Sequence, residues 1–324
     1  MKMNRRAALD GKVAIITGAS SGIGEATARE FAQAGAITVL AARRIERLQK
    51  LQREIEAMGG QALAVQTDLT DINQITNLVQ TTLAGFDRID ILANIAGWAF
   101  YDWFEELSSE EVRNAFEVNV LGMAELIRQV IPTMKEQRSG FILNMSSYVS
   151  RLSVPPLTVY ASTKYAVEGL TDGLRRTLQP FGITVIRIHP SSVSGTEFAK
   201  RPYRPGAVTY TPVPIGRISR ERLARHLAGL IEKPRRALFI SRLYEVPVQI
   251  NRFFPAIMDW VSETWIRRKR KDEVPPVEET APVRYGSSFS LLPMIGGILT
   301  LTLISKLWRK KTFSSFDRNE RKGS

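Results

Sequence analysis

The stretch VAIITGASSGIG, residues 13 to 24, decides how this chain folds. A β-branched apolar run leads into glycines at 18, 22 and 24, and a helical pattern follows. Glycine is needed there because the chain turns tightly, a phosphate must approach the backbone, and the helix packs close to the strand. The N-terminus of that helix attracts the anion. We therefore predict a nucleotide site, formed by Gly18, Ser20, Ser21, Gly22, Ile23 and Gly24.

From this turn to Ile240, short β-branched runs alternate with amphipathic helical runs. Such alternation is typical of a parallel sheet covered on both faces. The predicted strands are VAIIT (13–17), ITVLAA (37–42), ALAVQ (62–66), IDILAN (89–94), GFILNMSS (140–147), ITVIRIH (183–189) and ALFIS (237–241). The predicted helices cover 24–34, 45–58, 72–84, 110–136 and 160–180. We predict an α/β fold: a doubly wound, parallel, seven-stranded sheet of the Rossmann type, with ligands at the carboxyl ends of its strands and a helical C-terminal extension.

The composition limits the kinds of chemistry available. The 324 residues are 44% hydrophobic, which is enough for one domain of roughly 200 to 250 residues plus an extension. The absence of cysteine excludes disulfides, thiolate metal sites and a cysteine nucleophile. The two histidines, His189 and His226, argue against a histidine-based metal site, and we predict no metal.

The net charge of +13 is unevenly distributed. Residues 1–199 hold 20 Lys and Arg against 21 Asp and Glu, whereas residues 200–324 hold 25 against 11. This asymmetry indicates a basic surface module attached to a near-neutral domain. The tail lacks the aromatic-interleaved basic platform of a nucleic-acid binder, so we expect no nucleic-acid partner. The charged start, MKMNRRAALDGK, lacks the apolar region of a signal peptide, and we expect no secretion.

The end of the second predicted strand bears on the choice of dinucleotide. A carboxylate about 20 residues past the glycines would bind a ribose 2′-hydroxyl, but Arg43 and Arg44 stand there. Guanidinium groups pair with a 2′-phosphate, which favours NADP(H) over NAD(H). The alternative is an ordinary solvated helix start, although arginine is unfavourable there for the helix dipole.

Together the motifs resemble the short-chain dehydrogenase/reductase family over roughly residues 10 to 215. TGASSGIG matches the family's TGxxxGxG motif, and NIAG (94–97) matches its NxAG motif. Asn119 in FEVNV matches the family's helix asparagine, and YASTK matches its YxxxK motif. Ser147 lies 13 residues before Tyr160, a spacing typical of the family's catalytic serine. Two departures are Ile95 in the NIAG turn and the stretch HPSSVSGTEF, in which Ser191 replaces a glycine and Thr196 comes one place late.

The resemblance implies a site and an assembly. The implied catalytic residues are Asn119, Ser147, Tyr160 and Lys164. The implied further cofactor contacts are Asp68, Asn94, Ala96, Gly97, Tyr160, Lys164, Pro190 and Thr196. It also implies a homodimer or homotetramer.

Tyr160 and Lys164 stand four residues apart, on one face of a helix. Moving a hydride between nicotinamide and a carbon requires a proton to move to or from the attached oxygen. A phenol has a pKa near 10, and a nearby ammonium favours its ionised form. We interpret Tyr160 as the acid/base, Lys164 as the cation that tunes it, and Ser147 as the donor that holds the substrate oxygen. Taken singly, these residues could equally be a core tyrosine, a solvated lysine and a turn serine.

Two segments concern the substrate. The stretch GWAFYDWFEEL, 97–107, places Trp98, Phe100, Tyr101, Trp103 and Phe104 at the mouth of the expected cleft. Aromatic lining suits a hydrophobic carbonyl compound or alcohol, although the rings could instead pack the next helix. The proline-rich stretch 200–215 resembles the family's variable substrate loop.

The C-terminal part predicts contact with a membrane. Residues 286–305 carry no charge, and as a helix they would span roughly 30 Å. The alternatives are a helix lying on the bilayer or an extension docked on a neighbouring subunit. We divide the chain into a catalytic domain (1–245), a basic helix and proline-rich linker (246–285), a membrane-anchoring helix (286–308) and a basic tail (309–324). We expect the catalytic domain to face the cytoplasm, where NADP(H) is available.

The sequence thus predicts a membrane-associated, NADP(H)-dependent oxidoreductase that interconverts a hydrophobic ketone or aldehyde and its alcohol. The alternative is a regulatory protein that binds NADP without turnover.

Overall fold

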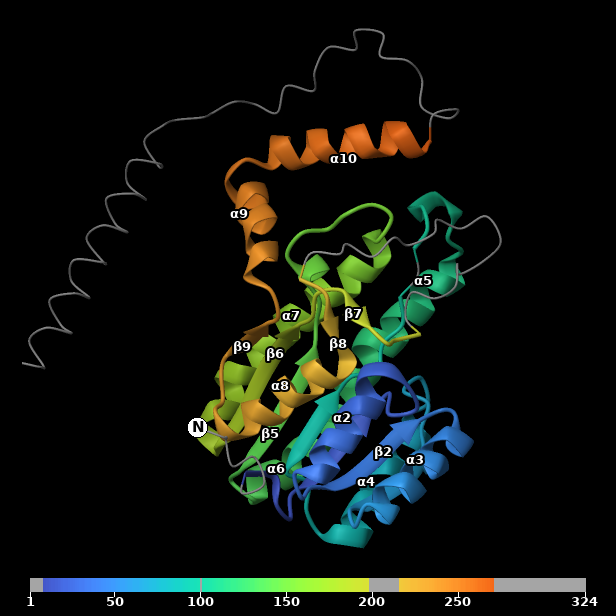
Figure 1. The fold of residues 1–324 in the computed structure, drawn as a ribbon, viewed down its shortest axis with the longest axis vertical. Coiled ribbons are helices and arrows are strands. Elements are labelled where there is room, and N and C mark those ends of the chain that lie inside the picture. Colours follow the sequence, from blue (N-terminus) through green and yellow to red (C-terminus); the bar gives the residue numbers. More distant parts are fainter. Residues whose placement is uncertain (1–7, 100, 198–215, 271–324) are drawn as a thin grey trace, which may run out of the picture. The chain divides into compact units, whose positions relative to one another are not determined.

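The computed structural model describes residues 8–99, 101–197 and 216–270, and within them seven parallel strands form one sheet in the order β3-β2-β1-β4-β5-β6-β9 (Figure 1). The strands are β1 (Val13–Thr17), β2 (Ile37–Ala42), β3 (Gln61–Gln66), β4 (Ile91–Asn94), β5 (Gly140–Met145), β6 (Ile183–His189) and β9 (Ala237–Phe239). This confirms the predicted doubly wound Rossmann-type sheet.

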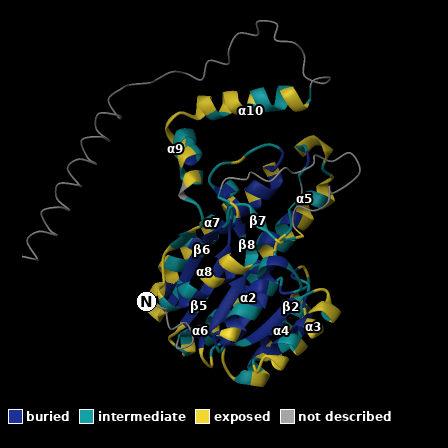
Figure 2. Cartoon of the chain, viewed as in Figure 1, coloured by how far each residue is buried: buried dark blue, intermediate teal, exposed yellow. Residues whose placement is uncertain are grey.

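The central strands β1, β4 and β5 are buried on both faces, because their side chains alternate between two cores (Figure 2). Ala14 and Ile16 of β1 face one core, while Val13 and Ile15 face the other. The first core is completed by α2 (Gly22–Gln33), α3 (Ile45–Ala57) and α8 (Arg220–Glu232). The second is completed by α4 (Ile72–Phe86), α6 (Gly122–Glu136) and α7 (Thr158–Leu178). Two apolar layers explain why these strands read as continuous hydrophobic runs.

The strand order reverses beside β1. The chain moves outward from β1 through β2 to β3, and then returns to pair β4 with the other side of β1. At such a reversal the connections after the two central strands run to opposite faces, which opens a crevice at their carboxyl ends. The glycine turn after β1, the NIAG turn after β4 and the serines after β5 all begin at this edge.

The helix predicted over 110–136 is interrupted, and its continuity was predicted wrongly. It consists of α5 (Ser109–Phe116), a wide π-helical turn at Glu117–Leu121 (η2), and α6. The start of α5 is fixed by Ser108 and Glu111, each of which bonds the other's backbone amide. The wide turn holds one residue more than a regular turn, and Asn119 lies inside it.

Short elements complete the described part of the chain. A two-stranded parallel ribbon pairs β7 (Val193–Ser194) with β8 (Ile218–Ser219). The 3₁₀ turns are η1 (Phe104–Glu106), η3 (Tyr148–Ser150), η4 (Gln179–Phe181) and η5 (Arg242–Tyr244). Two more helices follow, α9 (Glu245–Phe253) and α10 (Pro255–Lys269).

The chain divides into two units, Met1–Lys269 and Arg270–Ser324. Within the described ranges, no helix combines the length and the apolar character needed to cross a bilayer. The predicted anchoring helix at 286–308, the tail at 309–324 and most of the proline-rich linker lie outside the described residues.

Candidate active site

The glycine turn and the NIAG turn touch at the crevice. Gly18 has φ +71°, and a Cβ on it would lie 2.9 Å from Ala96 Cα. A Cβ on Gly24 would lie 2.3 Å from the Gly18 carbonyl oxygen. A Cβ on Gly22 would lie 3.4 Å from Thr196 Cγ2, so Thr196 also reaches this turn. Close backbone approach therefore requires glycine at 18 and 24, as the sequence predicts, whereas glycine at 22 is favoured by its φ of +60°.

A residue missed by the sequence analysis joins these turns. Thr17 Oγ1 accepts hydrogen bonds from the backbone amides of Ile95 and Ala96, both at 3.0 Å. It donates to the carbonyl oxygen of Ala93 at 3.4 Å. Ile95 contributes its main chain to this arrangement, which explains why the family's asparagine can be replaced there. Thr17 could have been found as the last residue of β1, directly before the glycine turn.

Of the two arginines predicted for a 2′-phosphate, Arg43 and Arg44, the structure places Arg44 beside the glycine turn, where its partner is Arg47 and not Arg43. Arg44 Nη2 donates to Ser20 Oγ at 3.1 Å and to Ser21 Oγ at 2.9 Å. Its Nη1 pairs with Glu197 Oε2 at 3.2 Å, while Arg47 Nη1 holds the other oxygen of Glu197 at 3.0 Å. These hydrogen bonds from Arg47 and Arg44 lower the pKa of Glu197. The site thus holds one carboxylate between two guanidinium groups, a donor set that suits a phosphate.

Arg43 and Asp68 lie at the ends of neighbouring strands. The side chain of Arg43 is exposed, and its carbonyl oxygen accepts from Gln66 Nε2 at 3.1 Å. Asp68 Oδ1 accepts from the amide and the hydroxyl of Thr70, at 3.0 and 2.9 Å. Both residues follow the strands on the β2-β3 side of the crevice.

Tyr160 and Lys164 lie together on the buried side of α7. Lys164 Nζ is 5.6 Å from the centroid of the Tyr160 ring. The two residues are 3% (Lys164) and 8% (Tyr160) exposed. Lys164 Nζ also donates to the carbonyl oxygen of Met145, the last residue of β5, at 2.9 Å. Ser147 follows two residues later, and its hydroxyl accepts from the Val149 amide at 3.3 Å.

Burial lowers the pKa of Lys164 from its ordinary value of 10.5 to about 8. The cause is desolvation, which penalises the charged amine inside the protein. The amine is still mostly protonated at pH 7. Lys164 can therefore carry a positive charge beside the phenol at neutral pH.

Asn119 is fixed in the wide turn by its amide group. Its Oδ1 accepts from the Trp98 amide at 2.7 Å, and its Nδ2 donates to the Trp98 carbonyl oxygen at 2.7 Å. Nδ2 also donates to Thr163 Oγ1 at 3.1 Å, and Thr163 in turn donates to the Tyr160 carbonyl oxygen at 2.7 Å. A Cβ on Gly97 would lie 3.3 Å from Asn119 Oδ1 and 3.5 Å from Lys164 Nζ. The structure therefore brings Asn119 and Lys164 together at Gly97.

The remaining predicted cofactor residues occupy different environments. Asn94 lies at the end of β4, and its side chain donates to Asn144 Oδ1 at 2.9 Å, which ties β4 to β5. Pro190 directly follows β6. Thr196 Oγ1 donates to the Val193 carbonyl oxygen at 3.3 Å. Asn94 is thus committed to the sheet, whereas Thr196 lies at the edge of the crevice.

Of the two segments predicted to concern the substrate, the structure describes only part. Phe100 of the aromatic segment and the whole predicted loop at 200–215 lie outside the described residues. Trp98 packs against the small cluster of Ala115 and Val159. Trp103 contacts Trp265 of α10, with ring centroids 6.0 Å apart. Aromatic side chains from two distant segments therefore meet beyond the NIAG turn.

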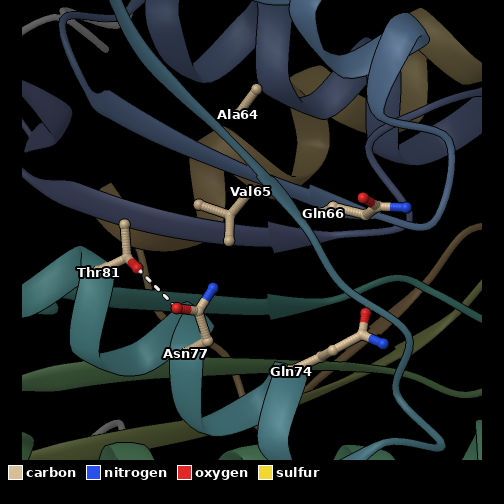
Figure 3. A pocket seen from close by; sticks show the side chains of 6 residues that line it. All are labelled: Ala64, Val65, Gln66, Gln74, Asn77 and Thr81. Carbon is tan, nitrogen blue, oxygen red and sulfur yellow. Dashed lines mark hydrogen bonds between the residues drawn. The ribbon is translucent and has the colours of Figure 1, made fainter.

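A pocket of about 480 Å³ lies elsewhere, between β3 and α4 (Figure 3). It is lined by Ala64, Val65, Gln66, Gln74, Asn77 and Thr81. This lining offers amide groups and one hydroxyl but no acid, base or nucleophile. None of the predicted catalytic residues lines it, so we assign the chemistry to the crevice.

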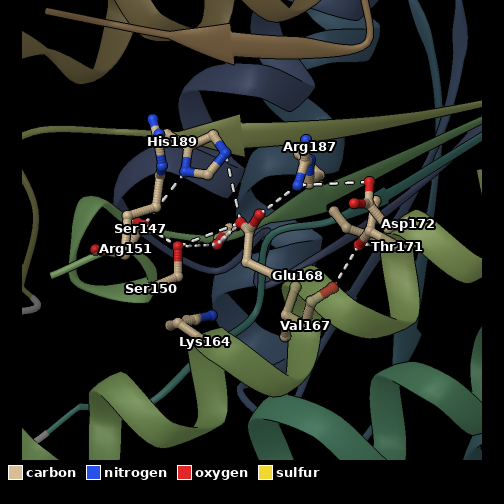
Figure 4. A network of polar contacts seen from close by, with 12 residues as sticks. Ser147, Ser150, Arg151, Lys164, Val167, Glu168, Thr171, Asp172, Arg187 and His189 are labelled. Atoms are coloured by element: carbon tan, nitrogen blue, oxygen red, sulfur yellow. Dashed lines mark hydrogen bonds and ion pairs between the residues drawn. The ribbon is translucent and has the colours of Figure 1, made fainter. Parts of the chain in front are cut away.

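The polar network behind Ser147 was not predicted (Figure 4). Glu168, one turn beyond Lys164 on α7, reaches the serines after β5 and Arg187 on β6. Glu168 stands four residues after Lys164 in the sequence, on the same helix face. That spacing could have identified Glu168 from the sequence alone.

Comparison with known proteins agrees with this geometry. Residues 12–204, more than half of the chain, match the family model described as short chain dehydrogenase. The chain belongs to the short-chain dehydrogenase/reductase family. The family membership agrees with the motifs in the sequence.

Relatives and solved structures support this membership. An uncharacterized oxidoreductase of Staphylococcus saprophyticus is 39% identical over 166 residues, which are 51% of this chain and 66%, just under two thirds, of that relative's length. A metagenomic short-chain oxidoreductase solved with NADP is 29% identical, with a TM-score of 0.60 over 70% of this chain and 92% of that one. A 7α-hydroxysteroid dehydrogenase solved with NADH and 7-oxo glycochenodeoxycholic acid is 28% identical, with a TM-score of 0.63 over 71% and 91%.

Proposed function

We propose that this protein is an NADP(H)-dependent oxidoreductase that interconverts a hydrophobic ketone or aldehyde and its alcohol, at a membrane surface. The observation that carries the proposal is the buried pair of Tyr160 and Lys164, with Nζ 5.6 Å from the ring centroid, beside Gly97 at the carboxyl edge of the sheet. An acid with an adjacent cation at this edge is what reduction of a carbonyl group requires.

The residues have distinct roles in the reducing direction. The hydroxyl of Ser147 donates a hydrogen bond to the substrate oxygen and holds it beside Tyr160. The phenol of Tyr160 gives its proton to that oxygen as the carbon gains a hydride, so the carbonyl group becomes an alcohol. The ammonium of Lys164 stabilises the negative charge left on the phenol. NADP(H), when bound, supplies the hydride and takes it back in the oxidising direction.

The cofactor would be held by the turns at the crevice. Gly18 and Gly24 leave the backbone of this turn without side chains where a pyrophosphate needs access, and Ala96 packs against it. Lys164 and Asn119 lie at Gly97, where the nicotinamide ribose would reach. We propose contacts from Thr196, Pro190 and Ile23 at the rim of the same crevice. Asn94 would act by ordering the strand end beneath the cofactor, since its side chain bonds Asn144.

The preference for NADP(H) is supported by the anion site at the glycine turn. Arg44 is already oriented by Ser20 and Ser21, and with Arg47 it binds a carboxylate. A 2′-phosphate carries more charge and three acceptor oxygens, so it is the better partner for these two guanidinium groups. NAD(H) would leave them with Glu197 alone.

A hydrophobic substrate is supported by the aromatic side chains beyond the NIAG turn, which include the Trp103 and Trp265 contact. The steroid dehydrogenase among the solved relatives was determined with 7-oxo glycochenodeoxycholic acid, a ketone on a largely hydrocarbon ring system. We propose that this chain acts on a carbonyl compound of similar apolar character.

Membrane association is supported by the chain around α10. Large hydrophobic side chains are exposed along α9 and α10, among them Phe253, Ile257 and Trp260, at 58%, 49% and 66% exposure. Five consecutive cations, residues 267–271, follow, and the uncharged run 286–305 comes after a short linker. Exposed aromatics next to cations suit an anionic lipid surface.

The catalytic proposal is tested with purified full-length protein, NADPH and a panel of apolar carbonyl compounds, followed by NADPH absorbance. Tyr160→Phe removes the proton donor and is expected to stop turnover while NADPH still binds. If this variant turned over at the wild-type rate, the catalytic assignment would be wrong. A non-catalytic regulator would bind NADPH but would not oxidise it with any compound on the panel.

The membrane proposal is tested separately. The chain without residues 286–324 is expected to keep its turnover and to lose binding to vesicles that contain anionic lipid. If the shortened chain failed to fold, we would conclude that residues 286–324 dock on protein and do not anchor the chain in a membrane. Undiminished binding to vesicles would assign lipid contact to α9 and α10 instead.

A further inference from the structure

The segment that carries Ser147 out of β5 is held by two side chains of α7. Lys164 Nζ donates to the Met145 carbonyl oxygen at 2.9 Å. One turn further along the helix, Glu168 Oε1 accepts from Ser146 Oγ at 2.6 Å. Tyr160, Lys164 and Glu168 recur at intervals of four residues, so one helix face carries the proposed acid, its cation and this carboxylate. The mechanism proposed above uses the first two and leaves Glu168 without a role.

The carbonyl oxygen of Ser147 is bonded from two directions. Within its own turn it accepts from the Ser150 amide at 3.2 Å and from Ser150 Oγ at 2.5 Å. From β6, His189 Nδ1 lies 3.3 Å away. His189 is 0% exposed, and its ring stacks on Phe239 with centroids 4.4 Å apart. The imidazole is therefore fixed in place, and its contact with Ser147 does not depend on a mobile side chain.

His189 stands between two acceptors (Figure 4). Its Nε2 is 3.4 Å from Glu168 Oε1, and its Nδ1 faces the Ser147 carbonyl oxygen. A neutral imidazole has one N–H and can donate to only one of them. Among the described residues, Nε2 has no hydrogen-bond partner, whereas Nδ1 has good geometry toward Ser147. The proton of the neutral ring therefore belongs on Nδ1.

The charged and polar groups around His189 come from three elements. Glu168 faces it from α7, Arg187 from β6, Tyr148 from η3, and Arg151 from the end of that turn. Burial lowers the pKa of His189, and the charges of Arg187 and Arg151 act in the same direction. The carboxylate of Glu168 opposes them, and the net direction is downward. His189 is therefore neutral at pH 7 and donates to Ser147.

Glu168 itself is neutralised from its other side. Its Oε2 lies 2.6 Å from Arg187 Nη1, and Arg187 also pairs with Asp172 at 3.4 Å. The side chains of Glu168 and Arg187 are only 14% and 16% exposed. The ion pair is thus largely withdrawn from water, where loss of one partner is felt strongly.

We propose that Glu168 and His189 are positioning residues, which fix the main chain around Ser147 and thereby aim its hydroxyl at the substrate oxygen. The proposal rests on the proposed function, because it requires Ser147 to act on the substrate. Glu168 accepts from the hydroxyl of Ser146, directly before Ser147, and His189 donates to the carbonyl group of Ser147 itself. A misplacement of about 1 Å at a reacting group can cost about a hundredfold in rate.

The kinetic test is a double-mutant cycle in the full-length protein, with NADPH and 1-decalone or whichever panel ketone turns over. Glu168→Gln keeps the size of the side chain and removes its charge. Alone it is expected to lower kcat by roughly tenfold to a hundredfold and to change the Kd for NADPH by less than about twofold. In a Ser147→Ala background it is expected to have no further effect on kcat, because it acts through the Ser147 hydroxyl. Glu136→Gln, on the exposed end of α6, is the matched control.

The structural test is independent of any substrate. The chain has two histidines, so the imidazole ¹⁵N signals of His189 can be assigned with the variant His226→Gln. We expect a neutral ring protonated at Nδ1 at pH 7, with protonation of Nε2 only below pH 6.5, because burial lowers the pKa of the imidazole from that ordinary value. Glu168→Gln is expected to lower the pKa of His189 further and to shift the backbone amide signals of residues 146–148.

Either of two results would overturn the proposal. One is an equal loss of kcat from Glu168→Gln with and without the Ser147 hydroxyl, which would mark Glu168 as a general structural residue. The other is an unchanged spectrum at His189 and residues 146–148. Wild-type turnover by Ser147→Ala would instead refute the proposed role of Ser147, and the spectra would still show whether Glu168 holds this segment.

Discussion

The substitution Lys164→Met tests the electrostatic basis of the site through folding stability. The pKa of Lys164 is about 8 in the folded chain against 10.5 ordinarily. This difference of about 2.5 pH units means that burial of the ammonium costs about 3 kcal/mol wherever the amine is protonated in both states. Methionine has a similar shape and no charge, so the variant avoids this cost. It also leaves the Met145 carbonyl oxygen without its donor, which costs about 1 to 3 kcal/mol.

The pH dependence separates the two contributions. Below pH 8 the folded and unfolded chains both hold the proton, and the cost of burial is fully present. Between pH 8 and 10.5 the folded chain has lost the proton that the unfolded chain still binds, so wild-type stability rises with pH. Lys164→Met lacks this term. The wild type is therefore expected to gain about 2.5 kcal/mol relative to the variant between pH 7 and pH 10.

The assay is urea unfolding of both proteins at pH 7, 8, 9 and 10, with the difference in free energy of unfolding plotted against pH. Other titrating groups cancel in the difference. Lys50→Met, on the exposed side of α3, is the control and is expected to show no such rise. A difference that stays flat within about 0.5 kcal/mol would refute the reasoning, because it would mean that Lys164 keeps an ordinary pKa in the folded chain. At pH 7 the variant is expected to be as stable as the wild type or more stable, and inactive.

Three further predictions concern the cofactor turn. Arg44→Gln is expected to weaken NADPH binding by roughly tenfold and NADH binding by less than about twofold, measured by quenching of tryptophan fluorescence. Glu197→Gln is expected to tighten NADPH binding by roughly two- to fivefold without affecting NADH, since it removes the carboxylate that competes for Arg44; weaker NADPH binding would contradict this. Gly18→Ala is expected to destabilise the chain by about 2 to 4 kcal/mol in thermal unfolding, because its methyl group would meet Ala96. Gly59 has a similar φ, +79°, and nothing within 4 Å of an added Cβ. Gly59→Ala therefore measures the backbone strain alone and is expected to cost about 1 to 2 kcal/mol.

The sheet could be predicted because its strands are buried on both faces. Runs such as VAIIT and ITVIRIH carry β-branched residues at nearly every position, and glycine or proline marks several of their ends. The observed strands differ from the predicted ones by at most two residues at either end. The carboxyl edge followed from the same pattern, because parallel strands end on one side. Ser147 and the two glycine-containing turns could therefore be assigned to a common crevice before any coordinates.

The missing parts depend on pairings between distant residues. Thr17 bonds the backbone 78 and 79 residues later, and Arg44 meets Glu197 across 153 residues. No local pattern encodes such contacts. The wide turn at Glu117–Leu121 also escaped prediction, since the hydrophobic pattern runs on through it and its glycine, Gly122, comes only after the turn. The two-residue strands β7 and β8 are too short to show a period.

The wide turn at Glu117–Leu121 restricts which insertions and deletions the stretch from α5 to α6 can accept. Each residue advances a regular helix by about 100°, so the additional residue lets α5 face Val159 while α6 faces the main sheet core. Deleting one residue among 117–121 would restore regular geometry but rotate one half away from its partner. A sequence redesigned for an ideal helix here would remove the wide turn that carries Asn119. In this stretch, a change that makes the helix more regular is therefore expected to reduce activity.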